Sequence, residues 1–138
     1  MRYYLDTNIL VFMLSGSSDD INTKVKDILY DYSNILLTSS IAANELILLH
    51  KIGKIELLGC KSSNEVFDKL MATGIEIVFF NKHHLSKYIT LDLVDGHKDM
   101  NDHAIIAQSI SDKIPLISSD TKFHQYTNQG LYFLFNKR

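Results

Sequence analysis

The chain has 138 residues, of which 46% are hydrophobic and 22% charged, and its formal net charge at pH 7 is −2. This composition excludes a largely disordered chain, and the length suits one domain with a substantial core. The single cysteine, Cys60, excludes an internal disulfide and a Cys-x-x-Cys site. No leader-like segment precedes Asp6, and no apolar run approaches the roughly 20 residues of a membrane span. We therefore expect a soluble, cytoplasmic protein that does not contact the membrane.

Short apolar runs alternate along the chain with segments of helical periodicity. In chain order, these patterns predict a strand at 3–5, helices at about 8–14 and from Asp20 to 32, a strand at 35–38, helices at 40–52 and 62–74, a strand at 75–80, helices at 82–92 and 99–112, and strands at 114–118 and 131–134. This alternation is typical of a parallel sheet covered by helices on both faces. The sequence therefore predicts a single α/β domain over residues 1–138, a three-layer α/β/α sandwich around about five parallel strands.

Two aspartates follow strands of the predicted sheet. Asp6 ends the first strand, and Asp120 follows the fourth after Ser118 and Ser119. Because ligands of open parallel sheets bind at the carboxyl ends of the strands, both are candidate site residues. Each aspartate also has a purely structural interpretation as the cap of a helix or turn. For either aspartate alone, the sequence leaves the functional and the structural interpretation open.

Two further carboxylates lie on apolar faces of predicted helices. Glu45 shares its face with apolar residues only, which are Ile41, Leu48, Leu49 and Ile52. An unpaired glutamate in such a stripe is costly, so we expect Glu45 to point inward toward a partner. Asp102 shares its face with Ile105, Ile106 and Ile110. Asp99 lies three residues before it, the spacing of a capping box, and a cap at Asp99 would fix the turn that directs Asp102 toward the core.

If Asp6, Glu45, Asp102 and Asp120 meet at one edge of the sheet, their charges repel one another and raise their pKa values. A hard divalent cation removes this conflict, and Mg²⁺ or Mn²⁺ prefers carboxylate oxygens together with water and substrate phosphate. A cation held in this way supports hydrolysis of phosphodiester bonds. The four carboxylates therefore favour metal-dependent phosphoryl chemistry.

Four blocks of the chain, in order, resemble the PIN-domain nucleases. They are Tyr4-Leu5-Asp6-Thr7-Asn8-Ile9-Leu10, the segment 39–46 around Glu45, the segment 97–103 around Asp102, and the segment 115–123 around Asp120. A stand-alone domain of this size most resembles the VapC-type toxins of toxin–antitoxin pairs. The resemblance implies an Mg²⁺- or Mn²⁺-dependent endoribonuclease that cuts RNA, forms a homodimer and is neutralised by a cognate antitoxin.

The resemblance also assigns roles to residues of this chain. It makes the four carboxylates the catalytic metal ligands, and it places Asn8 and Ser119 beside them as supporting or substrate-positioning residues. Asp99 matches a structural aspartate of the family. Two positions depart from the family pattern, since Met100 replaces the usual proline and His103 the usual arginine. His103 is therefore a substrate-positioning candidate that carries a shorter side chain, only partly charged near neutral pH, at this position.

Other interpretations remain open at this stage. A catalytically weak PIN-like module that binds RNA or a protein is one alternative; the four filled acidic positions argue against it, and the two departures keep it open. A haloacid-dehalogenase-like phosphatase is another, although it requires a second aspartate where Asn8 stands. The six histidines are expected at exposed positions or helix ends, with His97 and His103 near the site. Leu46 and Ile47 widen the apolar surface of their helix, which is typical of a partner surface or of a fully buried helix.

Overall fold

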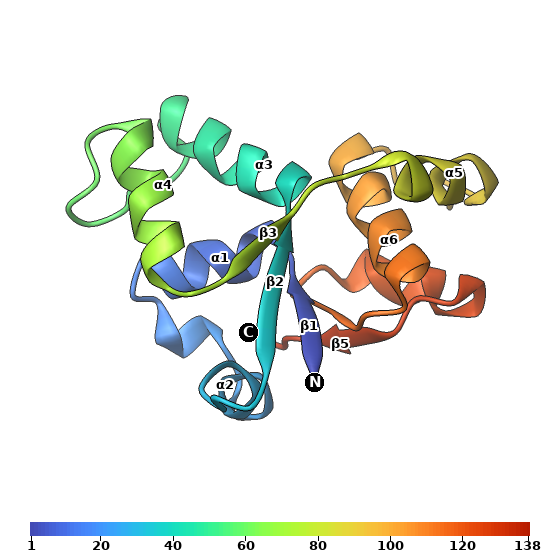
Figure 1. Cartoon of the computed structure of the whole chain (residues 1–138), viewed down its shortest axis with the longest axis horizontal. Helices are drawn as coiled ribbons and strands as arrows, with labels where there is room; N and C mark the ends of the chain where they lie inside the picture. Colours follow the sequence, from blue (N-terminus) through green and yellow to red (C-terminus); the bar gives the residue numbers. More distant parts are fainter.

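One sheet of five parallel strands runs through the centre of the molecule (Figure 1). The computed structural model describes every residue from Met1 to Arg138. The strands are β1 Arg2–Leu5, β2 Ile35–Ser39, β3 Glu76–Val78, β4 Leu116–Ser118 and β5 Phe133–Phe135. Their order across the sheet is β3-β2-β1-β4-β5, so β1 occupies the centre between β2 and β4. The predicted fold class is confirmed.

Helices cover both faces of this sheet, with α1, α3 and α4 on one side and α5 and α6 on the other (Figure 1). No helix is long and apolar enough to cross a membrane. The α-helices are α1 Thr7–Leu14, α2 Thr23–Leu29, α3 Ser40–Lys51, α4 Ser63–Ala72, α5 Lys82–Thr90 and α6 Met100–Asp112, and two 3-10 helices are η1 Ser18–Asp20 and η2 Thr121–Gln129.

The ends of several strands differ from the sequence prediction by one or two residues, the short helix η1 was not predicted, and the larger differences are at α2 and η2. Helix α2 begins at Thr23 and is capped by the side chain of Asn22, which accepts from the backbone N–H of Val25 at 2.9 Å, whereas we expected Asp20 to be the cap. Helix η2 was not predicted because its sequence is mostly polar. It is nevertheless anchored in the core, since Phe123 and Tyr126 are both fully buried. These two side chains attach the segment after β4 to the rest of the molecule.

A buried polar network connects the sheet to helices α3 and α6. The amide of Gln108 donates to the Val78 carbonyl at 3.0 Å and to the Tyr4 hydroxyl at 3.2 Å. Its oxygen accepts from the Ser39 hydroxyl, which also caps α3, and the Tyr4 hydroxyl donates to Asp112. Gln108 therefore fixes where α3 begins relative to the sheet, and with it the place of Glu45 on that helix.

Replacing Gln108 by leucine is expected to destabilise the fold by about 3 kcal/mol. The leucine fills the same space but removes the acceptor for the buried Ser39 hydroxyl proton and the side-chain donor to the Val78 carbonyl, and each such loss costs about 1–3 kcal/mol. Urea unfolding of the variant and of Gln125→Leu, whose side chain is exposed, measures the difference. Equal unfolding free energies for the two variants would contradict the role given to Gln108.

Candidate functional site

A cavity of about 260 Å³ lies where β1 and β4 end. All four carboxylates singled out in the sequence line it, and each comes from a different element. Asp6 follows β1 and caps α1, and Asp120 follows β4 and caps η2. Glu45 projects from α3, and Asp102 from the first turn of α6. Asp6 and Asp120 are therefore helix caps and cavity residues at once.

Asp6 is the most enclosed of the four carboxylates, with only 4% of its surface exposed. One oxygen accepts from the Thr7 backbone N–H at 2.8 Å, and the other accepts from the Ser118 hydroxyl at 2.6 Å. Burial, together with the neighbouring charges of Asp102 and Glu45, raises the pKa of Asp6 to about 7 against the lowering effect of these hydrogen bonds. Without a bound cation, the Asp6 carboxyl is therefore partly protonated near neutral pH.

The serine that contacts Asp6 is Ser118 rather than the neighbouring Ser119. Successive side chains of an extended segment point to opposite faces, so only one of the two reaches Asp6. Ser119 donates its backbone N–H to the Asn8 side chain at 3.2 Å, and its hydroxyl accepts from Asn136 at 2.7 Å. Asn8 donates to Asp6 at 3.3 Å and to Ser118 at 3.2 Å. Ser118 and Asn8 are thus the direct supports of Asp6.

Glu45 lies at the rim of the cavity, and the expected buried stripe around it is wrong. The buried residues of α3 are Ala42, Ala43 and Leu46, whereas Leu48 and Ile52 are 47% and 55% exposed. Helical spacing showed that these apolar residues share a face but not whether that face is covered. Glu45 accepts a hydrogen bond from the Asn101 side-chain amide at 2.8 Å. Asn101 was missed in the sequence, where only its place beside Asp102 pointed to it.

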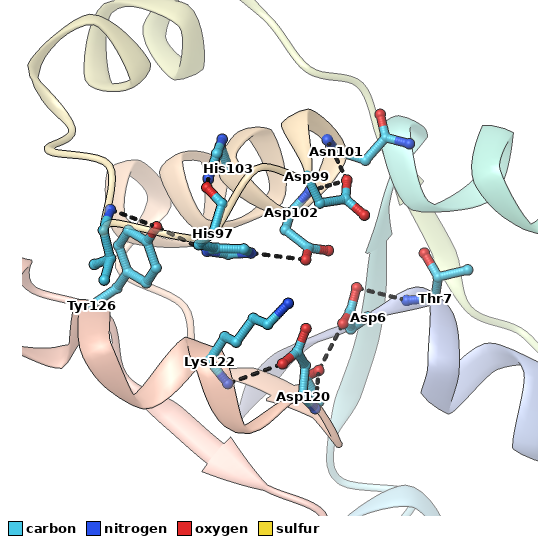
Figure 2. Close-up of polar contacts among 12 residues, drawn as sticks. Asp6, Thr7, His97, Asp99, Asn101, Asp102, His103, Asp120, Lys122 and Tyr126 are labelled. Carbon is cyan, nitrogen blue, oxygen red and sulfur yellow. Dashed lines mark hydrogen bonds and ion pairs between the residues drawn. The ribbon is translucent and has the colours of Figure 1, made fainter.

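Asp102 points from α6 into the cavity (Figure 2). Asp99 caps this helix as expected, accepting from the backbone N–H groups of Asn101 and Asp102 at 2.9 and 3.3 Å. The reciprocal half of the expected capping box is not formed, because the Asp102 carboxylate bonds to Nε2 of His97 at 3.0 Å instead. Burial, and then the charges of Asp99 and Asp120, raise the pKa of Asp102 to about 7.

Three of the six histidines, His84, His97 and His103, are buried rather than exposed. His84 and His103 lie at the starts of α5 and α6, as expected of helix ends, whereas His97 lies in the segment before α6. His103 does not line the cavity. Its Nε2 donates to the backbone carbonyl of His97 at 2.9 Å, and the two rings meet edge to face at 4.6 Å. Burial lowers the pKa of both His97 and His103. The residue in the place of the family's arginine thus supports the segment before α6 and makes no contact with the cavity.

The donor set of the cavity suits a hard divalent cation. Its four carboxylates offer the oxygen ligands that Mg²⁺ and Mn²⁺ prefer, and a cation would offset the burial and the mutual repulsion that together raise the pKa values of Asp6 and Asp102. Thr7 adds a second indication, because it is a residue of the cavity lining and its hydroxyl is the one buried side-chain polar atom without a hydrogen-bond partner. Such an atom requires a partner such as water held in the cavity.

Comparisons with known proteins agree with this architecture. The chain is similar to a chain of VapBC2 from Rickettsia felis bound to a promoter DNA fragment, with 23% identity, a TM-score of 0.70, and coverage of 99% of this chain and 100% of that chain. DNA-bound VapBC from Salmonella typhimurium gives 13% identity and a TM-score of 0.72, covering 98% of each chain. VapC20 from Mycobacterium tuberculosis, described as a toxin that cleaves the sarcin–ricin loop, gives 14% identity and a TM-score of 0.61, covering 89% of this chain and 93% of that chain.

At these identities, the solved structures establish a shared fold. No curated protein sequence matches the chain. The PIN domain family matches it directly, over residues 3–128, a range that includes all four carboxylates of the cavity. This match removes the haloacid-dehalogenase-like phosphatase as an alternative. The chain belongs to the PIN domain family.

Proposed function

We propose that this chain is a metal-dependent endoribonuclease and the toxin of a toxin–antitoxin pair, with residues 1–138 forming one nuclease domain. The observation that carries the proposal is the convergence of Asp6, Glu45, Asp102 and Asp120 on one cavity of a PIN-domain chain. A module that only binds RNA or a protein has no need of four neighbouring carboxylates, two of them with pKa values raised to about 7.

In this proposal the four carboxylates hold Mg²⁺ or Mn²⁺. When bound, such a cation supplies a hydroxide nucleophile and stabilises charge on the phosphate. The remaining residues of the site prepare the ligands. Ser118 and Asn8 orient Asp6, Asn101 orients Glu45, and the cap at Asp99 sets the first turn of α6. Because Asp6 and Asp102 hold protons near pH 7, both must release them as the cation binds.

Two positively charged side chains, those of Arg138 and Lys122, are placed to contact RNA phosphates. Arg138 lines the cavity, with its guanidinium 4.8 Å from the centre of the Phe12 ring. The side chain of Lys122 points toward the space between Asp102 and Asp120 (Figure 2). The net charge of −2 provides no general attraction for nucleic acid, so local contacts of this kind must do so. Similarity to a toxin that cleaves the sarcin–ricin loop supports RNA as the substrate.

An antitoxin and a second copy of the chain are the proposed partners, in the cytoplasm. Two groups of exposed apolar side chains offer contact surfaces for them. One group lies on α5 and the start of α6 and consists of Leu85, Ile89 and Met100, and the other lies on α3 and α4 and consists of Leu48, Ile52, Phe67 and Met71. Similarity to chains of VapBC complexes supports the proposal that an antitoxin binds this chain. Light scattering of the purified chain, alone and with its co-expressed antitoxin, tests both associations.

Cleavage of a mixed RNA pool tests the proposed activity. The pool contains transfer, ribosomal and messenger RNA and is incubated with Mg²⁺, Mn²⁺ or EDTA, and Asp6→Asn protein purified identically is the control for contaminating nucleases. We expect discrete cuts that require metal and are lost in the variant. Equal cutting by both proteins would reveal a contaminant. Absence of both cutting and metal binding would favour the binding module instead.

Ser118→Ala is expected to weaken Mn²⁺ binding about tenfold at pH 7.5, because the Ser118 hydroxyl orients Asp6 and lowers its pKa. Ser119→Ala is the matched control and is expected to bind within about twofold of the unchanged chain, since its hydroxyl contacts Asn136 and no carboxylate. Calorimetric titration of each variant measures the dissociation constants. The supporting role of Ser118 is wrong if the two variants bind Mn²⁺ equally.

A further inference from the structure

His97 lies against Asp102, one of the carboxylates of the cavity, and the proposed function has so far given it no role. We propose that Tyr126 and His97 form a positioning chain that holds Asp102 for a cation, with His97 acting as a hydrogen-bond donor and not as a metal ligand. Tyr126, His97 and Asp102 lie in a row in Figure 2. The inference rests on the proposed function only in assigning the cation to Asp102.

The hydrogen bonds fix where the protons of this chain lie. The Tyr126 hydroxyl oxygen accepts from the Val94 backbone N–H at 3.2 Å and lies 2.8 Å from Nδ1 of His97. Tyr126 is fully buried, so its own hydroxyl proton needs an acceptor within the protein. Nδ1 of His97 is the acceptor within reach, and it accepts only when it carries no proton.

The other ring nitrogen gives the same assignment. Nε2 of His97 lies 3.0 Å from a carboxylate oxygen of Asp102. When Asp102 is ionised, a proton on Nε2 lets the ring donate to this oxygen, whereas without that proton two lone pairs would face each other. The tautomer protonated at Nε2 therefore satisfies the Val94 N–H, the Tyr126 hydroxyl, both nitrogens of His97 and the Asp102 oxygen together.

The surroundings of His97 prevent its ring from leaving this place. Only 4% of the residue is exposed. Its backbone carbonyl accepts from Nε2 of His103, and its backbone N–H donates to the Val94 carbonyl at 3.0 Å. Its ring packs edge to face on those of His103 and Tyr126, with centroids 4.6 and 5.4 Å apart. A donor held this firmly restricts the rotation of the Asp102 carboxylate.

Direct coordination by His97 is the competing arrangement. A ring nitrogen of His97 and one oxygen each of Asp102 and Asp120 lie within 4.8 Å of one another, close enough to share an ion, and Nε2 is the nitrogen that faces Asp102. Coordination requires Nε2 without its proton, which would move to Nδ1. The two arrangements therefore predict opposite tautomers of His97.

Nitrogen NMR of the imidazole side chains in ¹⁵N-labelled, otherwise unchanged protein distinguishes them. At pH 8.5, where Asp102 is ionised, we expect His97 to be protonated at Nε2 in EDTA and also with saturating Mg²⁺. Protonation at Nδ1 in either state would overturn the proposal. In the Mn²⁺-loaded protein, electron spin echo spectroscopy should show no directly bound nitrogen, and detection of one would overturn it too. Because the tautomer is measured without metal or RNA, it remains testable if the proposed function fails.

Two substitutions of nearly equal size test whether the donor matters. His97→Gln places an amide donor near the position of Nε2, whereas His97→Met has the same length and no donor. We expect the methionine variant to bind Mn²⁺ about tenfold more weakly than the unchanged chain, and the glutamine variant within about threefold. A purely structural role for the side chain predicts equal losses in the two variants, and that result would overturn the proposal. If both variants fail to fold, the tautomer in the unchanged chain decides.

Discussion

Replacing Asp6 by asparagine is expected to abolish RNA cleavage and, at the same time, to stabilise the metal-free protein at pH 8. A bound metal supplies several kcal/mol of transition-state stabilisation, and each 1.4 kcal/mol is a factor of ten in rate. We therefore expect the rate to fall by about 1,000-fold or more. The folded state gains stability because a buried carboxylate whose pKa is raised to about 7 is replaced by an uncharged group of the same shape.

Single-turnover cleavage and thermal unfolding in EDTA measure the two effects of this substitution. The melting temperature should rise by about 5 °C, since 1 kcal/mol corresponds to roughly 2–4 °C or more in a chain of this size. Asp68→Asn, on the exposed surface of α4, is the matched control and should change neither quantity. Cleavage close to that of the unchanged chain, or a lower melting temperature, would contradict the place given to Asp6.

The metal-free protein is expected to lose stability as pH rises through the range in which Asp6 and Asp102 titrate. Both carboxyls have pKa values of about 7 in the folded chain, against about 3.9 in an unfolded one. Between these values the folded state binds more protons, so its stability falls as pH rises. At about 1.4 kcal/mol for each pKa unit, the loss between pH 4 and pH 8 amounts to a few kcal/mol.

Urea unfolding in EDTA at several pH values measures this loss. The buried His97 and His103 act in the opposite direction below about pH 6.5, because their lowered pKa values favour folding as pH rises. Comparison with Asp6→Asn removes this contribution, since both proteins contain the two histidines. The free energy of unfolding of Asp6→Asn should exceed that of the unchanged chain only slightly at pH 4.5 and by a few kcal/mol at pH 8. At pH 8, saturating Mg²⁺ should restore the stability of the unchanged chain. An advantage that does not change with pH would contradict the raised pKa of Asp6.

The alternation of elements and the four carboxylates were predictable because both depend on local sequence. Each strand is a short apolar run, and a parallel sheet brings its carboxyl ends to one edge, which places Asp6 and Asp120 together. Asp102 was predictable from its place on the apolar face of α6. The cap at Asp99 explains why Met100 can replace the family's proline, since the side chain of Asp99 sets the first turn without it.

The parts of the site that could not be predicted depend on contacts distant in sequence. Ser118 reaches Asp6 because β4 lies beside β1 in the sheet, and the sequence alone does not show which face of β4 is turned to the cavity. His97 meets Tyr126 across 29 positions of the chain, within a helix whose polar sequence gave no periodic signal. The exposure of Leu48 depends on what covers α3, which helical spacing does not show.

Calorimetric titration of Mn²⁺ at pH 7.5 tests most directly the central claim, that the four carboxylates form one metal site. The unchanged chain is compared with Asp6→Asn, Glu45→Gln, Asp102→Asn and Asp120→Asn. We expect the unchanged chain to bind Mn²⁺ with release of protons, seen as a heat that depends on the ionisation enthalpy of the buffer, and each substitution to weaken binding about tenfold or more. Absence of binding by the unchanged chain, or binding that survives all four substitutions, would contradict the claim.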